Sequence, residues 1–271
     1  MSLSKKIVSL FRPWLRSRFK RYGHKYSTNK DILINVPVSL NVLLIGIYLT
    51  DYANQAAILK KQFSSSKFHN VEQKWFAIGE NPIPVEMQDV TIGHSSTKIP
   101  KFELLTNLLN NIDYQKYDYL IISDDDIHIL ADFIDLYLLY VEKFALKIAQ
   151  PARTFYSFHD HKICLAQKNV TCRATNFVEI GPIFSIHRTV YGDILPFPVE
   201  SPMGYGLDFI WPKIAEKKYF RIGIVDATPV DHSYRPQGKT YSANLNTIQM
   251  NEMLSKYENN KDVEKKALYY F

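Results

Sequence analysis

Apolar and polar positions alternate along the 271-residue chain in blocks of strand length and of helix length. Continuous apolar runs that contain β-branched residues predict strands buried on both faces. Such strands are expected at residues 41–50 (NVLLIGIYLT), 74–79, 117–123, 149–156 and 174–186. Apolar residues spaced three or four positions apart predict helices at residues 51–63, 100–112, 131–148 and 209–217.

This order of strands and helices predicts an α/β domain with an open, doubly wound and mostly parallel sheet flanked by helices. In such sheets, ligands bind beyond the carboxyl ends of the strands. We expect residues 31–242 to form this domain and residues 243–271 to form a C-terminal helical tail. The longest apolar run, Val42–Leu49, is too short to span a bilayer, so no transmembrane helix is expected.

The positive charge of the chain is concentrated in residues 1–30, which contain nine Lys or Arg residues and no acidic residue. The rest of the chain has 24 basic against 27 acidic side chains, a net charge of −3, so no nucleic-acid partner is expected. Within this basic arm, Trp, Phe and Leu recur at helical spacing between Lys and Arg, which is typical of an amphipathic helix on an anionic membrane surface. Packing of the helix on the body or on a partner subunit is the alternative.

The two cysteines, Cys164 and Cys172, are too few for a disulfide framework or a four-ligand zinc site. They are expected to be free thiols of a reducing compartment, or to close one small loop. Because no secretory signal precedes them, we favour the first interpretation. Together with the basic arm, it predicts a cytoplasmic protein peripheral to the inner face of the membrane.

Three adjacent carboxylates, Asp124, Asp125 and Asp126, follow the strand expected at residues 117–123. Ionised and about 5 Å apart, each pair would repel by roughly 3 kcal/mol at an effective dielectric constant of about 20, so a cation is expected to compensate them. Hard carboxylate oxygens suit Mg²⁺ or Mn²⁺, which usually share their coordination with substrate phosphates. The alternative is a charge cluster that stabilises the helix beginning near Ala131 through its dipole.

At this point the sequence resembles a known family. The segment 119–126 (YLIISDDD) resembles the Asp-x-Asp motif with which GT-A-fold glycosyltransferases hold a divalent cation and the diphosphate of a nucleotide sugar. Three later segments follow in that family's order. They are 176–186 (NFVEIGPIFSI), which resembles the acceptor-side strand, 204–208 (GYGLD), which resembles the acceptor-site segment, and Val225-Asp226 followed by Asp231-His232. The resemblance covers about residues 40–235.

The resemblance implies a cation, Mn²⁺ or Mg²⁺, held by Asp124, Asp126 and His232. It also implies that the nucleotide-sugar donor contacts Asp124 and Asp125, and three further residues are candidates for the donor: Asp51, Lys98 and Lys101. Asp51 is placed to accept a ribose hydroxyl, although capping of the helix at 51–63 explains it equally well. Lys101 and Lys98 precede a helix and are candidates for phosphate contacts, with a solvated surface as the alternative. A lone histidine such as His232 is often structural, which is the alternative for it.

Asp208 is the candidate catalytic base. The glycines around it, Gly204 and Gly206, allow close approach of a substrate, and apolar neighbours would raise its pKa into the range of a general base. The alternative is that Asp208 caps the helix at 209–217. Glu179 is a weaker candidate for the base. The roles of three basic residues stay open between an anionic acceptor and the diphosphate: Arg153, His187 and Arg188.

The resemblance therefore implies a metal-dependent glycosyltransferase that moves a sugar from a nucleotide-sugar donor, and we expect the acceptor to be a glycan or a lipid-linked molecule in surface polysaccharide biosynthesis. Inversion is preferred because Asp208 offers a base. One alternative is another metal-dependent phosphate enzyme, such as a nucleotidyltransferase or phosphohydrolase. The other is a non-catalytic glycan-binding protein with a retained fold.

Overall fold

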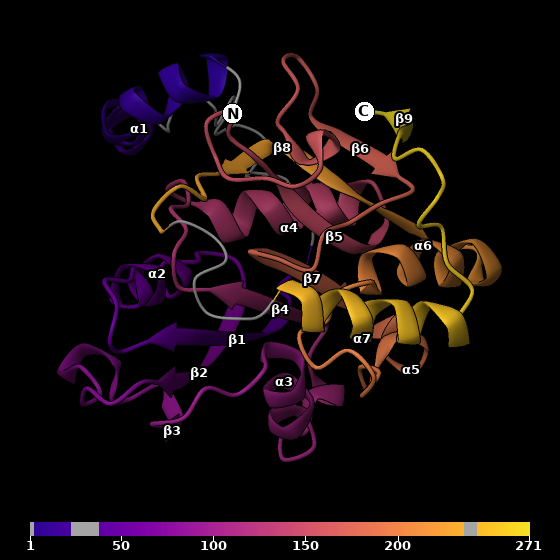
Figure 1. Cartoon of the computed structure of the whole chain (residues 1–271). Coiled ribbons are helices and arrows are strands. Elements are labelled where there is room, and N and C mark those ends of the chain that lie inside the picture. The colour runs from indigo at the N-terminus through magenta and orange to yellow at the C-terminus, as the bar shows by residue number, and fades with distance from the viewer. Residues whose placement is uncertain (1–2, 23–37, 236–242) are drawn as a thin grey trace.

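The structure is a computed structural model, and it describes residues 3–22, 38–235 and 243–271 (Figure 1). In these residues, nine strands form one sheet in the order β3-β2-β1-β4-β7-β5-β8-β6-β9. Their bounds are β1 (Asn41–Leu49), β2 (Asn70–Ile78), β3 (Thr91–Ser95), β4 (Tyr119–Asp124), β5 (Leu146–Arg153), β6 (Cys172–Thr175), β7 (Ile183–His187), β8 (Arg221–Val230) and β9 (Ala267–Tyr270). Only β6 and β7 run against the others, because each pairs antiparallel with both neighbours while the remaining pairs are parallel. The expected α/β fold with an open, mostly parallel sheet is confirmed.

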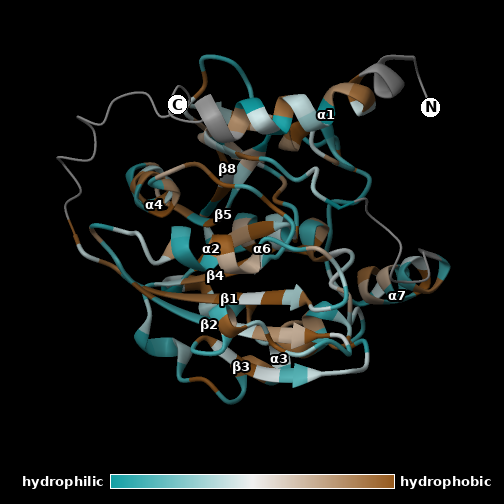
Figure 2. Ribbon diagram, turned by 90° about the vertical axis from the view of Figure 1, so that its left-hand side faces the viewer, coloured by the Kyte–Doolittle hydropathy of each residue, from teal (hydrophilic) through white to brown (hydrophobic). Residues whose placement is uncertain are grey.

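Helices cover both faces of this sheet. The described residues contain α1 (Leu3–Tyr22), α2 (Ala56–Phe63), α3 (Lys101–Leu109), α4 (Phe133–Lys143), α5 (Tyr191–Ile194), α6 (Leu207–Lys218) and α7 (Ala243–Lys256). Along β1, Val42 and Leu44 belong to the apolar cluster under α2 and α4, whereas Leu43 and Ile45 belong to the cluster under α3, α5 and α6. Both faces of the central strands are therefore buried, which explains their continuous apolar sequence. Figure 2 shows these strands mainly in brown between the helices.

Four expected elements differ from the structure. The helical tail expected at 243–271 contains α7 but ends in β9, which joins the sheet beside β6. The helix expected at 51–63 begins only at Ala56, because the Asp51 carboxylate accepts hydrogen bonds from the backbone of Glu80 and Asn81 and does not cap α2. The helix expected at 131–148 ends at Lys143, and Leu146 already belongs to β5. Since α4 and β5 are both buried, the apolar pattern continues across the turn between them and conceals it.

The single strand expected at 174–186 is two strands, β6 and β7, which pair with different neighbours in the sheet. Residues 176–182 form the connection between them. Phe177 and Val178 are fully buried in this connection, so the sequence stays apolar where the backbone leaves the sheet. The connection carries Glu179 to the edge of the sheet where β4 ends, because β7 begins beside Ser123.

Helix α1 packs on the body with one face. Its inner residue Phe19 is buried against Leu130 and Tyr156, and Val8 and Leu15 pack beside it. The outer face exposes three apolar side chains: Leu10 (78% exposed), Phe11 (55%) and Trp14 (57%). None of the helices in the described ranges is both long and apolar enough to cross a membrane.

Cys164 and Cys172 are buried free cysteines, so the expectation that they are free thiols is confirmed. Burial raises the pKa of both thiols, so they are held as neutral, unreactive groups.

Candidate active site

The aspartate triplet lies at the carboxyl end of β4, and the chain after β8 returns to it. Asp231 forms a two-way backbone bridge with His128, with hydrogen bonds of 2.9 and 3.0 Å. This bridge places the next residue, His232, beside the triplet, with its Nε2 atom 3.4 Å from Oδ1 of Asp126. The structure thus brings Asp126 and His232 together across more than 100 residues of sequence.

Arg235 completes this part of the site, and the sequence analysis did not find it. Its guanidinium lies 2.5 Å from Oδ1 of Asp125 and 3.4 Å from Oδ2 of Asp126. Asp125 is buried and also accepts the backbone N–H of Leu49 at 2.8 Å. The only sequence signal for Arg235 is its place three residues after His232.

The carboxylates of Asp125 and Asp126 are held in different charge environments. Burial raises the pKa of Asp125 to about 6, although Arg235 opposes the shift. Burial would also raise the pKa of Asp126, but the hydrogen bond and charge of His232, together with Arg235, outweigh it and lower that pKa. Asp126 is therefore the stronger acid of these two carboxyl groups.

Asp124 forms an ion pair with a lysine side chain. Its Oδ1 atom lies 2.7 Å from Nζ of Lys101, the first residue of α3. A side chain at Gly181 would begin 3.4 Å from the other oxygen of Asp124, so the connection between β6 and β7 passes close by. The structure thus joins two predicted donor-site residues, Asp124 and Lys101, whereas Lys98 is exposed.

The donor atoms of this edge fit a cation that takes part of its coordination from a substrate. Among the described residues, no group of three His, Cys, Asp or Glu side chains is arranged as a metal cluster. Asp126 and His232 nevertheless offer an oxygen and a nitrogen within 3.4 Å of each other, and Nδ1 of His232 is buried with no hydrogen-bond partner in the described residues. Mg²⁺ and Mn²⁺ usually keep few protein ligands and bind substrate phosphates as well.

Asp51 lies just beyond β1 and organises the neighbouring loop. Its carboxylate accepts the N–H groups of Glu80 and Asn81 at 2.8 and 2.9 Å, and these bonds lower its pKa. Gly79 before them has φ +136°, and its carbonyl lies 2.7 Å from Nε2 of His94. Asp51 therefore links the ends of β1 and β2.

The segment 204–208 forms a tight turn that leads into α6. Gly204 and Gly206 have φ values of +81° and +100°, a region that L side chains rarely adopt. Gly206 is the N-cap residue of α6, so the alternative that Asp208 caps this helix is wrong. Asp208 lies in the first turn of α6, 9% exposed, and its Oδ1 atom has no hydrogen-bond partner in the described residues.

Asp208 and Glu179 are two buried carboxylates with different partners. Burial and then the charge of Glu179 raise the pKa of Asp208 to about 7. Glu179 instead forms an ion pair with the buried Arg153. The Arg153 guanidinium also donates to the carbonyls of Phe158 and Gly181, at 2.7 and 2.5 Å. Glu179 thus forms an ion pair with an arginine, whereas Asp208 has its pKa raised to about 7.

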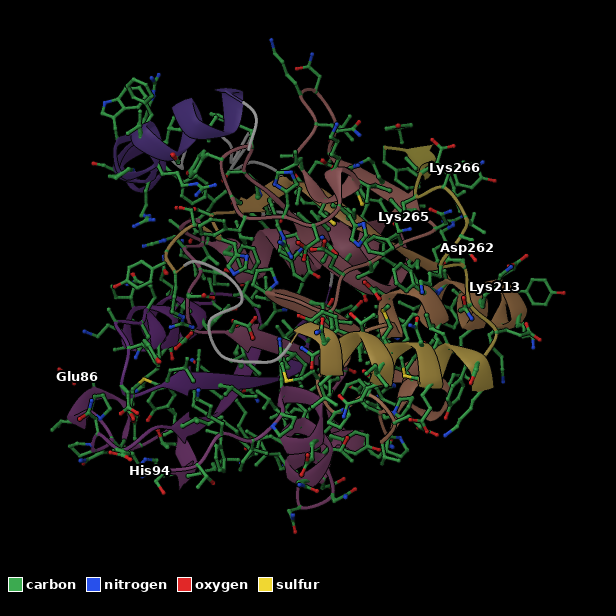
Figure 3. All side chains as sticks on the ribbon, in the orientation of Figure 1. Glu86, His94, Lys213, Asp262, Lys265 and Lys266 are labelled. Carbon is green, nitrogen blue, oxygen red and sulfur yellow. The ribbon has the colours of Figure 1, made fainter. Side chains whose placement is uncertain are left out.

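The chain after α7 contributes Lys265 to the same region, and the sequence analysis did not find this residue (Figure 3). Its ammonium lies 4.8 Å from the ring centre of Phe209 and 5.7 Å from that of Phe177. It opposes the rise in the pKa of Asp208. Only the tertiary fold brings this distant segment to the turn at 204–208.

Two of the basic residues whose roles the sequence left open lie elsewhere. His187 at the end of β7 pairs with Tyr119, the first residue of β4, whereas the triplet begins with Asp124, the last residue of β4. Arg188 next to it forms an ion pair with Asp118. Both residues therefore lie near the start of β4, at the opposite end of this strand from the triplet, and outside the candidate site.

No family model and no curated protein matches this sequence. Among solved structures, the chain is similar to GalNAc-T7 with UDP, GalNAc and Mn²⁺, with a TM-score of 0.51 and 9% identity over 75% of this chain and 45% of that one. It is also similar to residues 1–349 of TarS from S. aureus in complex with UDP-GlcNAc, with a TM-score of 0.52 and 10% identity over 79% of this chain and 67% of that one. The chain thus spans less than half of the GalNAc-T7 chain. At this identity the likeness defines the fold, and the chain has the GT-A fold of these glycosyltransferases.

Proposed function

We propose that the protein is a metal-dependent glycosyltransferase that uses a nucleotide-sugar donor. The observation that carries this proposal is the contact of Asp126 with His232 at the carboxyl edge of a GT-A sheet, with the buried Asp208 in a neighbouring turn. A divalent cation bound to Asp126 and His232 would act as a Lewis acid toward the diphosphate leaving group. Because the two similar structures were solved with UDP or UDP-GlcNAc, UDP-sugars are the first donors to test.

The remaining roles follow from the charges of the side chains. Lys101 and Arg235 balance the aspartates and are placed to meet the negative diphosphate. Asp208 takes the proton of the acceptor hydroxyl, which makes an inverting mechanism the preferred one. Asp51 holds the loop after β2 on the donor side, and its ribose contact remains part of this proposal. Half-exposed Tyr205, next to Asp208, offers a ring on which a sugar of the acceptor can stack.

We further propose that the acceptor is a glycan or a lipid-linked precursor of a surface polysaccharide, and that the protein acts on the cytoplasmic face of the membrane. The outer face of α1 supports this placement, because Leu10, Phe11 and Trp14 are exposed on a helix with seven basic residues and no acidic one. Apolar side chains among Lys and Arg are typical of helices that lie in an anionic membrane surface.

The test is a screen for release or transfer of sugar from nucleotide sugars, with and without Mn²⁺ or Mg²⁺. We expect turnover that needs the cation and that is lost in Asp126→Asn, since the amide loses the charge that binds the cation. Asp262→Asn changes an exposed carboxylate in the segment after α7. It is the matched control and should keep full activity.

Other outcomes of the screen assign the alternatives. Cleavage between the phosphates without sugar release would identify a phosphohydrolase or nucleotidyltransferase. Binding of glycans without turnover of any donor would identify a non-catalytic glycan-binding protein.

A further inference from the structure

The inner face of α1 contacts the segment that completes the donor site. Residues 231–235 contain His232 and Arg235, which contact Asp126 and Asp125. The sequence analysis favoured a membrane surface for the basic arm and left packing on the body as an alternative. In the structure, two of its arginines point to the body instead of to solvent: Arg12 and Arg16.

Arg16 binds the donor-site segment directly. Its Nε and Nη2 atoms donate to the Ser233 hydroxyl at 3.3 and 3.2 Å, and Nη2 also donates to the Ser233 carbonyl. The same guanidinium lies 3.8 Å from the buried carboxylate of Asp231 and 5.5 Å from the ring centre of Tyr234. One side chain of α1 thus contacts three residues of this segment, on both sides of His232.

Arg12 reaches the other side of His232 through the segment after β5. It donates to the carbonyl of Tyr156 at 2.8 Å, and its guanidinium lies 4.0 Å from the ring centre of Phe158. The N–H of Phe158 in turn donates to the carbonyl of His232 at 2.8 Å, and the N–H of His232 donates to the Ser157 hydroxyl at 2.9 Å. The backbone of His232 is therefore bonded to residues 157–158, and α1 contacts both this segment and residues 231–235.

We propose that α1 is a positioning element of the donor site, in which Arg16 holds residues 231–235 so that His232 and Arg235 meet the aspartate triplet. Hydrogen bonds from a charged donor to a carbonyl are among the stronger ones in proteins, and this one joins a helix to an irregular segment without other regular structure. The inference rests on the proposed function only for the identity of the ligand that the site binds. Arg16 acts through Ser233 and is not itself a catalytic residue.

The test compares full-length Arg16→Ala with Arg18→Ala by amide hydrogen exchange. Arg18 is the matched control, because it lies on the same helix but points outward, over the Trp14 ring at 5.4 Å. We expect exchange at residues 231–235 to become about tenfold faster or more in Arg16→Ala, while the core strands and the Arg18→Ala protein stay unchanged. Equal exchange at 231–235 in all three proteins, or the same increase in Arg18→Ala, would overturn the proposal.

A second readout is binding of UDP in the presence of Mn²⁺, measured by calorimetry. We expect Arg16→Ala to weaken this binding about tenfold, to raise KM for the donor more than KM for the acceptor, and to be partly restored in Arg16→Lys, which keeps one charged donor. If Arg16→Ala fails to fold, Ser233→Ala removes only the hydroxyl acceptor and carries the same test. Absence of turnover in the wild-type protein would contradict the proposed function, whereas the exchange experiment decides the role of α1 in either case.

Discussion

At the scale of single residues, the environment of each carboxyl group separates its role from that of its neighbours. Glu179 and Asp208 are both buried, but only Glu179 has an arginine partner. The pKa of Asp208 is raised to about 7 by burial and by the charge of Glu179. A base whose pKa lies near the working pH takes a proton readily and is still ionised, so Asp208 suits the transfer of a proton from a hydroxyl.

We expect Asp208→Asn to lower kcat by roughly 10²–10⁴, because the amide keeps the size of the side chain but does not accept the proton. Donor affinity should stay close to that of the wild type, since other residues hold the donor. Steady-state kinetics with a UDP-sugar and an acceptor measure both quantities. Near-normal turnover would exclude Asp208 as the base, and a loss of donor affinity would place it on the donor side.

The same residue predicts the pH dependence of the wild type. The base must be ionised, and its pKa is raised to about 7, so kcat/KM should be low at acidic pH and rise as the pH passes through about 7. This rise should be missing from the residual activity of Asp208→Asn.

At the scale of elements, the turn at 204–208 is tied to the start of α3. The carbonyl of Pro202 accepts the N–H groups of Phe102 and Glu103, at 2.8 and 3.0 Å. A Cβ atom at Gly204 would lie 2.2 Å from the Phe102 ring. The turn that carries Asp208 and the helix that begins with Lys101 therefore pack directly against each other, and the proposed donor and acceptor sides share these contacts.

We expect Gly204→Ala to destabilise the protein by about 1–3 kcal/mol, because the new side chain clashes with Phe102 and is strained at φ +81°. Turnover should fall as well, since Asp208 moves with the turn. Gly192→Ala is the matched control: nothing lies within 4 Å of its added Cβ, and it is helical, so stability should be unchanged or higher. Urea unfolding of both variants measures the difference, and equal stability would contradict the packing described here.

At the scale of the whole molecule, one face of α1 packs on the body and the other is exposed. Its inner face contacts residues 231–235, and its outer face exposes Leu10, Phe11 and Trp14. The helix lies across the top of the molecule in Figure 2, with strands β8 and β5 beneath it. Packing on the body and binding to a bilayer are thus compatible, and both can hold at once.

We expect the protein to bind vesicles that contain anionic lipids, and the binding to weaken as salt is raised because screening shortens the range of the basic charges. Phe11→Ser combined with Trp14→Ser should reduce binding by about tenfold or more, since two large apolar side chains no longer enter the interface. Val199→Ser removes an equally exposed apolar residue from another surface and should not change binding. Co-sedimentation with vesicles measures all three proteins, and unchanged binding of the double variant would refute this membrane surface.

The sequence by itself determined the central strands of the sheet, because buried parallel strands need continuous apolar runs. It also showed which polar residues follow each strand, because the apolar runs end where these residues begin. It also placed the aspartate triplet at the end of β4 and Asp208 at the start of α6. It misjudged the elements at 131–148 and 174–186, because apolar residues continue through the turn at 144–145 and through the largely buried connection at 176–182.

Only the tertiary structure shows how the distant side chains meet. The resemblance implied that Asp126 and His232 share one site, and their contact depends on the backbone bridge between His128 and Asp231, which no local pattern encodes. Arg235 and Lys265 reach the site from irregular segments, where neither spacing nor periodicity marks a residue as functional. The inward turn of Arg16 has the same origin: an amphipathic sequence predicts that a helix has two faces, but the surface that each face meets is set by the packing of the whole chain.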